Sequence, residues 1–246
     1  RIIYNHKIPQ IFSYLSFSII NCSCSSIDSF LLTVSSASGF PFIISSTISI
    51  PPIFTKIFPK NSFYEDFDLA YKFSNNKYWL GDYYQPIHKS YTLAITPTPD
   101  IPTAQLDKAI LVREYQKRGV WKKDYLTTEL KNGKLVANPK DFGVFSIMID
   151  NTKPTITPLN IKANSQFSQS NGVIRFTIND EHSGIKDYKA YIDGKWVLAE
   201  YDQKIKRLSI NLNKEEISVG DHQLELNVKD EKNNTTTYTT TFKKIS

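Results

Sequence analysis

"VIRFTIND" (residues 173–180) alternates apolar and polar side chains along its length. Successive side chains of a β-strand point to opposite faces, so Ile174, Phe176 and Ile178 fall together on one face. This two-residue period is the pattern of a strand that is buried on one side and solvated on the other. The stretch therefore predicts a half-buried β-strand.

The same alternation continues to the end of the sequence. A hairpin is predicted at "YKAYIDGKWVLAEY" (188–201), because Asp193-Gly194 is a strong two-residue turn signal. Further strands are predicted at "RLSINL" (207–212), "HQLELNV" (222–228) and "TYTTTF" (237–242). About seven short strands in roughly ninety residues are typical of an immunoglobulin-like sandwich, and another small Greek-key sandwich has the same strand count.

Residues 58–150 predict a second β domain. Asn132-Gly133 indicates a tight hairpin between "DYLTTEL" (124–130) and "LVAN" (135–138). "DNTKPTITP" (150–158) is rich in prolines and turn formers and is interpreted as the linker between the domains. Other strand-forming runs are "YTLAI" (91–95), "AILVREY" (109–115) and "GVFSIMID" (143–150).

The first 57 residues have a different composition. Residues 13–55 contain Asp28 as their one charged residue and are dominated by Ser, Ile and Phe. Serines and prolines disfavour a membrane-spanning helix, so the stretch is interpreted either as low-complexity or as a locally shifted reading frame. The expected fold class is therefore all-β, with tandem β-sandwich domains of which the C-terminal one is immunoglobulin-like, after a poorly structured Ser/Ile/Phe-rich N-terminal segment. The expected boundaries are 1–57, 58–150 and 151–246.

Charge and cysteine content exclude several classes of partner and site. The 30 basic and 24 acidic residues give a formal charge of +6, without a block of five like charges. Nucleic-acid-binding proteins concentrate basic residues on one face, so no nucleic-acid partner is expected. No run of eighteen apolar residues occurs, so no transmembrane helix is expected. Cys22 and Cys24 are too close for an ordinary disulfide, and no second ligand pair is present for zinc.

Residues for catalysis are not found in recognisable patterns. The four histidines are His6, His88, His182 and His222, and none has a second histidine two to four residues away. Neither a Gly-x-Ser-x-Gly elbow nor a Gly-rich phosphate loop is present. We therefore assign no catalytic residue and no metal ligand.

One alternative concerns "NDEHSG" (179–184), where Asp180, Glu181 and His182 come together at a turn. Carboxylate oxygens in an inter-strand loop can bind Ca²⁺, and Asp150 in the linker could add another ligand. Asp and Asn also form local backbone hydrogen bonds in ordinary solvated turns. This second interpretation is preferred.

A cluster of aromatic residues supplies the candidate binding residues. "KYWLGDYYQPIHKSY" (77–91) surrounds one histidine with tryptophan and tyrosines, and that histidine is expected on a partly exposed strand. Exposed aromatic rings stack on sugars or contact protein partners, whereas buried ones belong to the core. The candidates are Trp79, Tyr83, Tyr84, His88 and, directly after the second hairpin turn, Trp196.

Several blocks of sequence together resemble a known family. The blocks are "RIIYNHKIP" (1–9), "FPKNSFYEDFDLAY" (58–71), "PIHKSYTLAI" (86–95), "FGVFSIMIDNTKPTITPLNI" (142–161), "IRFTINDEHSGIKDYKAYIDGKWVLAEYD" (174–202) and "GDHQLELNVKDEKNNTTTYTTTF" (220–242). In order and spacing they resemble the non-catalytic, immunoglobulin-like region downstream of the peptidase domain in M23-family (LytM-like) metallopeptidases of Bacteroidetes-type bacteria. The resemblance skips the Ser-rich stretch, which favours the frame-shift hypothesis.

The resemblance implies an accessory role. The family's enzymes cut peptidoglycan with a zinc ion held by His-x-x-x-Asp and His-x-His motifs, and this sequence contains neither. No cofactor is therefore expected in this chain, and zinc is expected only in a catalytic domain upstream of Arg1. The implied partners are that peptidase domain or cell-wall glycan and peptide, and the implied location is the periplasm or cell envelope. By itself the chain is not expected to be an enzyme, whereas the full-length parent is expected to be an M23 zinc metalloendopeptidase.

Two other functions remain open from the sequence. A surface adhesin or glycan-binding module predicts exposed aromatic side chains. A passive structural stalk predicts no ligand, with Trp79 and Trp196 buried.

Overall fold

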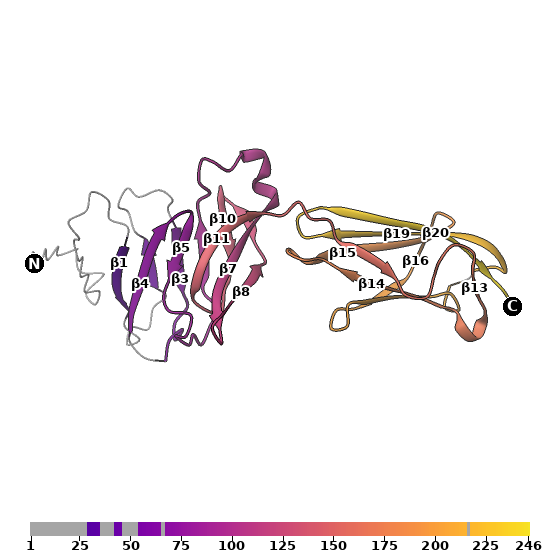
Figure 1. The fold of residues 1–246 in the computed structure, drawn as a ribbon, viewed down its shortest axis with the longest axis horizontal. Helices are drawn as coiled ribbons and strands as arrows, with labels where there is room; N and C mark the ends of the chain where they lie inside the picture. The colour runs from indigo at the N-terminus through magenta and orange to yellow at the C-terminus, as the bar shows by residue number, and fades with distance from the viewer. Residues whose placement is uncertain (1–28, 35–41, 46–53, 65–66, 216) are drawn as a thin grey trace, which may run out of the picture. The chain divides into compact units, whose positions relative to one another are not determined.

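The structure, a computed structural model, describes residues 29–34, 42–45, 54–64, 67–215 and 217–246. It consists almost entirely of β-strands and divides into two compact units, unit 1 (Arg1–Ile149) and unit 2 (Asp150–Ser246). Each unit has two β-sheets and its own hydrophobic core (Figure 1). The predicted all-β fold with tandem β-sandwich domains is confirmed.

Helices are few and short in the part of the chain that the structure describes. They are the 3-10 helices η1 (Thr103–Lys108) and η2 (Gln169–Asn171). None of the helices described is long and apolar enough to cross a membrane.

Unit 1 is a sandwich of two antiparallel sheets. The six-stranded sheet has the order β1 (Ser29–Val34), β4 (Phe67–Ser74), β5 (Lys77–Leu80), β11 (Gly143–Ile149), β7 (Ala109–Lys117) and β8 (Val120–Leu126). The five-stranded sheet has the order β2 (Phe42–Ser45), β3 (Phe54–Phe58), β6 (Thr92–Ile95), β10 (Lys134–Ala137) and β9 (Glu129–Lys131). Strands that are adjacent in space but distant in sequence, such as β6 and β10, fix the topology through long-range pairing.

The core of unit 1 is rich in aromatic rings. Phe142 lies 6.1 Å from Phe58 and 5.6 Å from Tyr91 between ring centroids, and all three side chains are buried. Gly81 approaches this cluster so closely that a Cβ atom there would lie 2.6 Å from the Phe142 ring, and its φ is +59°. Both the contact and the left-handed backbone require glycine at this position.

One strand predicted in unit 1 is divided in the structure. The alternation in 124–130 continues without a break, but the chain leaves the six-stranded sheet after Leu126 and enters the other sheet at Glu129. Thr128 makes this crossing, since its hydroxyl donates to the Leu126 carbonyl at 2.7 Å and accepts from the Leu111 N–H at 2.9 Å. The prediction of one continuous strand was therefore wrong.

The N-terminal segment 1–57 is described only in part. Its described strands are β1, β2 and most of β3, and they pair antiparallel with β4, β3 and β6. The other residues of this segment lie outside the described residues. The frame-shift hypothesis for 13–55 stays a prediction.

Unit 2 has the strand order of an immunoglobulin domain. The four-stranded sheet is β12 (Thr155–Pro158), β14 (Val173–Asn179), β18 (Arg207–Asn211) and β17 (Ala199–Asp202). The five-stranded sheet is β13 (Ser165–Phe167), β20 (Thr235–Lys244), β19 (Gly220–Asp230), β15 (Ile185–Ile192) and β16 (Lys195–Val197). In chain order these give the A-B-E-D and G-F-C-C′ sheets of that fold, and β13 pairs in parallel with β20.

Strand β14 is the half-buried strand predicted from the alternating apolar and polar side chains of residues 173–180. Ile174, Phe176 and Ile178 are fully buried in the core of unit 2. Asp193 and Gly194 have φ angles of 50° and 77°, the left-handed values of a two-residue hairpin turn between β15 and β16. The second arm of that hairpin is shorter than predicted, because the chain changes sheets at Leu198 and continues as β17.

Candidate metal centre

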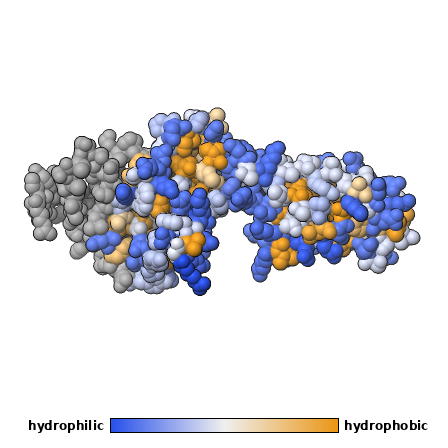
Figure 2. Space-filling view, in the orientation of Figure 1, coloured by the Kyte–Doolittle hydropathy of each residue, from blue (hydrophilic) through white to orange (hydrophobic). Residues whose placement is uncertain are grey.

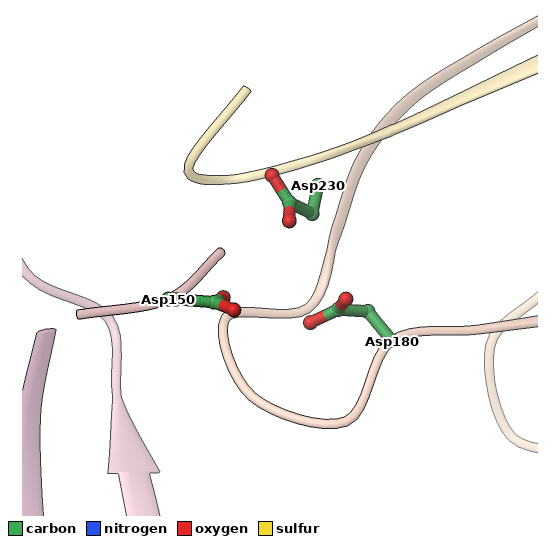
Figure 3. A group of neighbouring side chains, drawn as sticks. All are labelled: Asp150, Asp180 and Asp230. Carbon is green, nitrogen blue, oxygen red and sulfur yellow. The ribbon is translucent and has the colours of Figure 1, made fainter. Parts of the chain in front are cut away.

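Three aspartates of unit 2 converge from separate segments. Asp150 precedes β12, Asp180 follows β14, and Asp230 is the last residue of β19. One carboxylate oxygen from each lies within 4.8 Å of the other two. Figure 3 shows the three side chains facing a common space.

Strand register explains this convergence. Thr155 of β12 pairs with Asn179, so the start of unit 2 lies beside the end of β14 and next to Asp180. Ile185, the first residue of β15, pairs with Asp230, which brings the end of β19 beside the 180–184 loop. The immunoglobulin-like topology therefore assembles the three carboxylates at one end of unit 2.

Asp230 organises the turn between β19 and β20. Its Oδ1 accepts hydrogen bonds from the backbone N–H groups of Lys232 at 2.8 Å and Asn234 at 2.7 Å. Its Oδ2 accepts from the Asn234 side chain at 2.6 Å. Asp230 is 0 % exposed, and these hydrogen bonds replace the contacts with water that its carboxylate loses on burial.

Asp180 holds the loop that follows β14. Its Oδ2 accepts from the N–H groups of His182 at 3.0 Å and Gly184 at 2.9 Å, which is the local turn bonding preferred from the sequence. Its Oδ1 is buried and accepts no hydrogen bond from the described residues. One oxygen of Asp180 therefore holds the loop, and the other makes no hydrogen bond within the described residues.

Asp150 is the first residue of unit 2 and is as fully buried as Asp230. Its Oδ1 accepts from the Thr152 N–H at 3.0 Å and lies 3.4 Å from His182 Nδ1. Its backbone carbonyl accepts from Asn234 Nδ2 at 3.0 Å. The side chain is 0 % exposed, yet Oδ2 has no hydrogen-bond partner among the described residues.

The electrostatics of this cluster are unfavourable without a further group. Burying a carboxylate is costly unless it is paired or coordinates a cation. Here three carboxylates share one small volume, and two of their oxygens accept no hydrogen bond from the described part of the chain. A donor set made of carboxylate oxygens suits a hard cation.

Sequence reasoning found part of this cluster. It paired Asp180 with Asp150 as oxygen ligands in the calcium alternative, although it assigned no metal ligand. It missed Asp230, which lies 50 residues beyond Asp180. The available signal was that all three aspartates stand at or just beyond the end of a predicted strand, in "IMID", "TIND" and "NVKD".

The predicted aromatic candidates of unit 1 occupy different environments. Trp79 is half-buried on β5, with Lys72 Nζ 5.7 Å from its ring centroid. Tyr83 and Tyr84 pack with ring centroids 4.4 Å apart, and Tyr84 is 69 % exposed. The Tyr83 hydroxyl donates to Gln116 Oε1 at 3.2 Å, which links this pair to β7.

His88 lies in the loop before β6 and not on a strand, so the prediction of a strand residue was wrong. Its N–H donates to the Ser62 carbonyl at 2.8 Å, which attaches this loop to the segment between β3 and β4. Its exposed ring forms a hydrogen bond through Nδ1 with the Tyr64 hydroxyl at 3.1 Å. A surface pocket beside it is lined by Pro59 and Lys140 among others.

Two tryptophans are more exposed than the core interpretation predicts. Trp196 of β16 is 60 % exposed. Trp121 of β8, which sequence reasoning missed, is 55 % exposed and pairs across the strands with Gln116. Because directly opposed residues share a face of a sheet, Trp121 lies on the same face as Gln116, the partner of Tyr83.

Figure 2 shows hydrophobic residues on the visible face interspersed with hydrophilic ones in both units. Trp196 belongs to unit 2 and the other four candidates belong to unit 1. The five candidates therefore do not form one site within either unit.

Comparison with known proteins gives limited similarity. A family model described as a Zu5-like domain matches residues 50–150, which is less than half of the chain. No curated protein matches the chain at a significant level. The resemblance to M23-family peptidases stays a prediction.

Two solved structures are similar at a low level, and both are extracellular domains of BT4673 from B. thetaiotaomicron. One is described as a one-component system, with 9 % identity, a TM-score of 0.27 and coverage of 82 % of this chain and 36 % of that chain. The other is described as a hybrid two-component system, with 9 % identity, a TM-score of 0.26 and coverage of 85 % and 37 %. The chain thus spans little more than a third of their length, and TM-scores this low carry no argument about function. The Zu5-like match ends at residue 150 and includes neither Asp180 nor Asp230.

Proposed function

We propose that this chain is a non-catalytic accessory region of an M23-type peptidoglycan endopeptidase, which positions or docks an upstream zinc peptidase domain in the periplasm or cell envelope. The sequence resemblance supports the parent enzyme. The observation that carries the accessory role is the tandem arrangement of two β-sandwiches with separate, complete cores. Each sandwich is stabilised by its own burial, so the pair can act as a spacer or a docking module.

The first test is the coding sequence upstream of Arg1. The proposal expects an open reading frame with a His-x-x-x-Asp motif and a later His-x-His motif. A signal peptide that leads directly into Arg1 would contradict an upstream peptidase domain. This observation needs no purified protein.

The second test separates docking from spacing. The purified chain is mixed with insoluble peptidoglycan sacculi, and the bound fraction is measured after sedimentation at low and high salt. A docking module sediments with the sacculi at both salt concentrations and releases no soluble peptide. Binding that disappears at high salt reflects only the net charge of +6 and argues against specific docking.

A second candidate function is a glycan-binding or adhesin module. The observation that favours it is the exposure of Tyr84, Trp121 and Trp196, because aromatic rings stack on sugar faces. A passive stalk predicts a buried Trp196, whereas this side chain is 60 % exposed. A glycan pull-down with Trp121→Ala and Trp196→Ala variants tests this function, since loss of binding in one variant locates the binding unit.

A further inference from the structure

We propose that Asp150, Asp180 and Asp230 bind one calcium ion at the end of unit 2. This inference stands independently of the proposed accessory role, because it rests on the residues of unit 2 alone. Its starting point is the convergence of three carboxylate oxygens within 4.8 Å of one another.

The orphaned oxygen of Asp150 points to a ligand independently of the clustering. Its side chain is 0 % exposed, so water does not solvate it from the surface. Oδ2 nevertheless has no hydrogen-bond partner in the described chain, and the same holds for Asp180 Oδ1. Buried polar atoms are almost always satisfied, and a cation shared between these oxygens would satisfy both.

The donor set selects the class of cation. Calcium accepts six to eight oxygen ligands in a flexible geometry, so three carboxylate oxygens within 4.8 Å of one another can share one such ion. Magnesium demands a near-ideal octahedron and usually keeps several waters, with only one or two carboxylate ligands. Zinc prefers nitrogen and sulfur ligands, whereas the nearest imidazole nitrogen, His182 Nδ1, is directed at Asp150 Oδ1.

The surrounding hydrogen bonds show that the site is already built. Asp230 is fixed by the turn at 230–234, and Asp180 is fixed by the loop at 180–184. These two segments also touch, because the Glu231 N–H donates to the Gly184 carbonyl at 3.1 Å. The ligands are therefore pre-positioned, and calcium would cross-link them to the first residue of unit 2.

Thermal unfolding of the full chain tests the proposal. After removal of divalent ions by a chelator, the protein is titrated with calcium at constant ionic strength. At a free calcium concentration about ten times the dissociation constant, the unfolding temperature of unit 2 should rise by about 6–11 °C. Titration calorimetry should give one calcium ion per chain.

Asp180→Asn is the informative variant, because Asp180 Oδ1 takes no part in the loop hydrogen bonds. It should lose the calcium-dependent shift. Without calcium it should unfold at the same temperature as the wild type or higher, because one of three repelling charges is removed. Glu181→Gln is the matched control, since it removes an exposed charge from the next residue and should keep the full calcium response.

Hydrogen exchange measured on peptides provides a second readout that does not require assignment of the thermal transitions. Calcium should slow exchange in peptides that cover 150–154, 180–184 and 230–234, and should leave peptides from unit 1 unchanged. Asp150→Asn should abolish this protection. If that variant fails to fold, Asp180→Asn gives the same comparison.

Three results would overturn the proposal. The first is an unchanged unfolding temperature and exchange pattern on addition of calcium. The second is an equal calcium response in Asp180→Asn and the wild type. The third is an equal response to magnesium and calcium at matched ionic strength, which would contradict the assignment of calcium.

Discussion

His222 Nδ1 lies 2.7 Å from Asp193 Oδ2, and the other ring nitrogen of His222 lies 2.9 Å from the Ser218 carbonyl oxygen. Both neighbouring atoms are acceptors, so both ring nitrogens donate when the imidazole is protonated. Asp193 Oδ1 also accepts from the Gln223 N–H at 2.9 Å. The hairpin turn at Asp193 is therefore attached to β19 by two residues of that strand.

This arrangement predicts a loss of stability in acid. The hydrogen bond from the Gln223 N–H, and then that from His222, lower the pKa of Asp193 below its usual 3.8. A carboxyl group whose pKa is lower in the folded state stabilises the fold above the unfolded-state pKa and loses that contribution as pH falls through the folded-state pKa. Asp193→Asn should therefore destabilise unit 2 at neutral pH, and the difference from the wild type should shrink below about pH 4.

Urea unfolding at neutral and acidic pH measures this effect. Asparagine keeps the left-handed backbone of the turn, where Asp193 has a φ of 50°, so the variant tests the charge and not the turn. Asp187→Asn, at an exposed site on β15, is the control and should change stability little at either pH. A pH-independent difference for Asp193→Asn would contradict the prediction.

The buried Lys56 predicts a rise of stability with pH in unit 1 as well, at higher pH than the effect of Asp193. Its side chain is buried, and burial lowers its pKa from 10.5 to about 7. The unfolded state then binds more protons than the folded state between about pH 7 and 10.5, so the stability of unit 1 should rise with pH in this window. Lys56→Met should remove the slope and increase stability at pH 7 by about 2–4 kcal/mol, because each unit by which the pKa is lowered corresponds to about 1.4 kcal/mol.

Lys72 of β4, in the other sheet of unit 1, provides a matched control for Lys56. Lys56 Nζ lies 5.3 Å from the Tyr71 ring centroid, and Lys72 Nζ lies 5.7 Å from that of Trp79. Lys72 is exposed, so Lys72→Met loses a similar ring contact without relieving a buried charge. Chemical unfolding between pH 7 and 9 should show a pH slope in Lys72→Met that is the same as in the wild type.

Alanine at Gly81 should destabilise unit 1 more than alanine at a glycine with open space around it. Gly81→Ala places a Cβ atom against the Phe142 ring and forces a non-glycine residue to a φ of +59°. The expected loss in the free energy of unfolding of unit 1 is about 2–4 kcal/mol, from overpacking plus backbone strain. Gly119→Ala is the control, because its φ is +76° but nothing lies within 4 Å of the added atom, so only the strain of about 1–2 kcal/mol should remain. Equal losses in the two variants would rule out the contact with Phe142.

The hydrogen bonds of Arg113 stabilise unit 1 in a way that a lysine at this position should not reproduce. Its buried guanidinium donates from Nε to the Phe142 carbonyl at 2.8 Å and lies 2.6 Å from Asp124 Oδ2 through one terminal nitrogen. Lysine offers one ammonium group and cannot form both bonds. Arg113→Lys should destabilise unit 1 by about 2–4 kcal/mol in urea unfolding, whereas Lys123→Arg on the exposed strand β8 should have little effect.

Local features of the fold were predictable, and the crossings between sheets were not. Asn132-Gly133 and Asp193-Gly194 specify their hairpins through their own backbone preferences, so the sequence around them is sufficient. The chain changes sheets at Thr128 and at Leu198. The alternation of apolar and polar residues gives no sign of either change, because both sheets of a sandwich bury every second residue. Which sheet a segment joins is decided by the strands it pairs with, and those strands are distant in sequence.

The candidate metal centre was likewise predictable only where local sequence is sufficient. Asp150 and Asp180 were identifiable as oxygen donors because each follows a strand and precedes turn formers. Asp230 joins them through the pairing of Ile185 with Asp230, a relationship between two sequence-distant strands. His88 shows the reverse error, since it was expected on a strand but lies before β6, in a loop that is hydrogen-bonded to Ser62.

The position of β20 has a consequence for biosynthesis. This strand, the last one in unit 2, lies between β13 and β19, and the Ile245 N–H donates to the Phe167 carbonyl at 2.8 Å just beyond it. The immunoglobulin-like sandwich therefore cannot close until its final ten-residue strand has left the ribosome. Until then β13 and β19 present unpaired edges, and a nascent chain that pauses before residue 235 is exposed to aggregation or to chaperone capture.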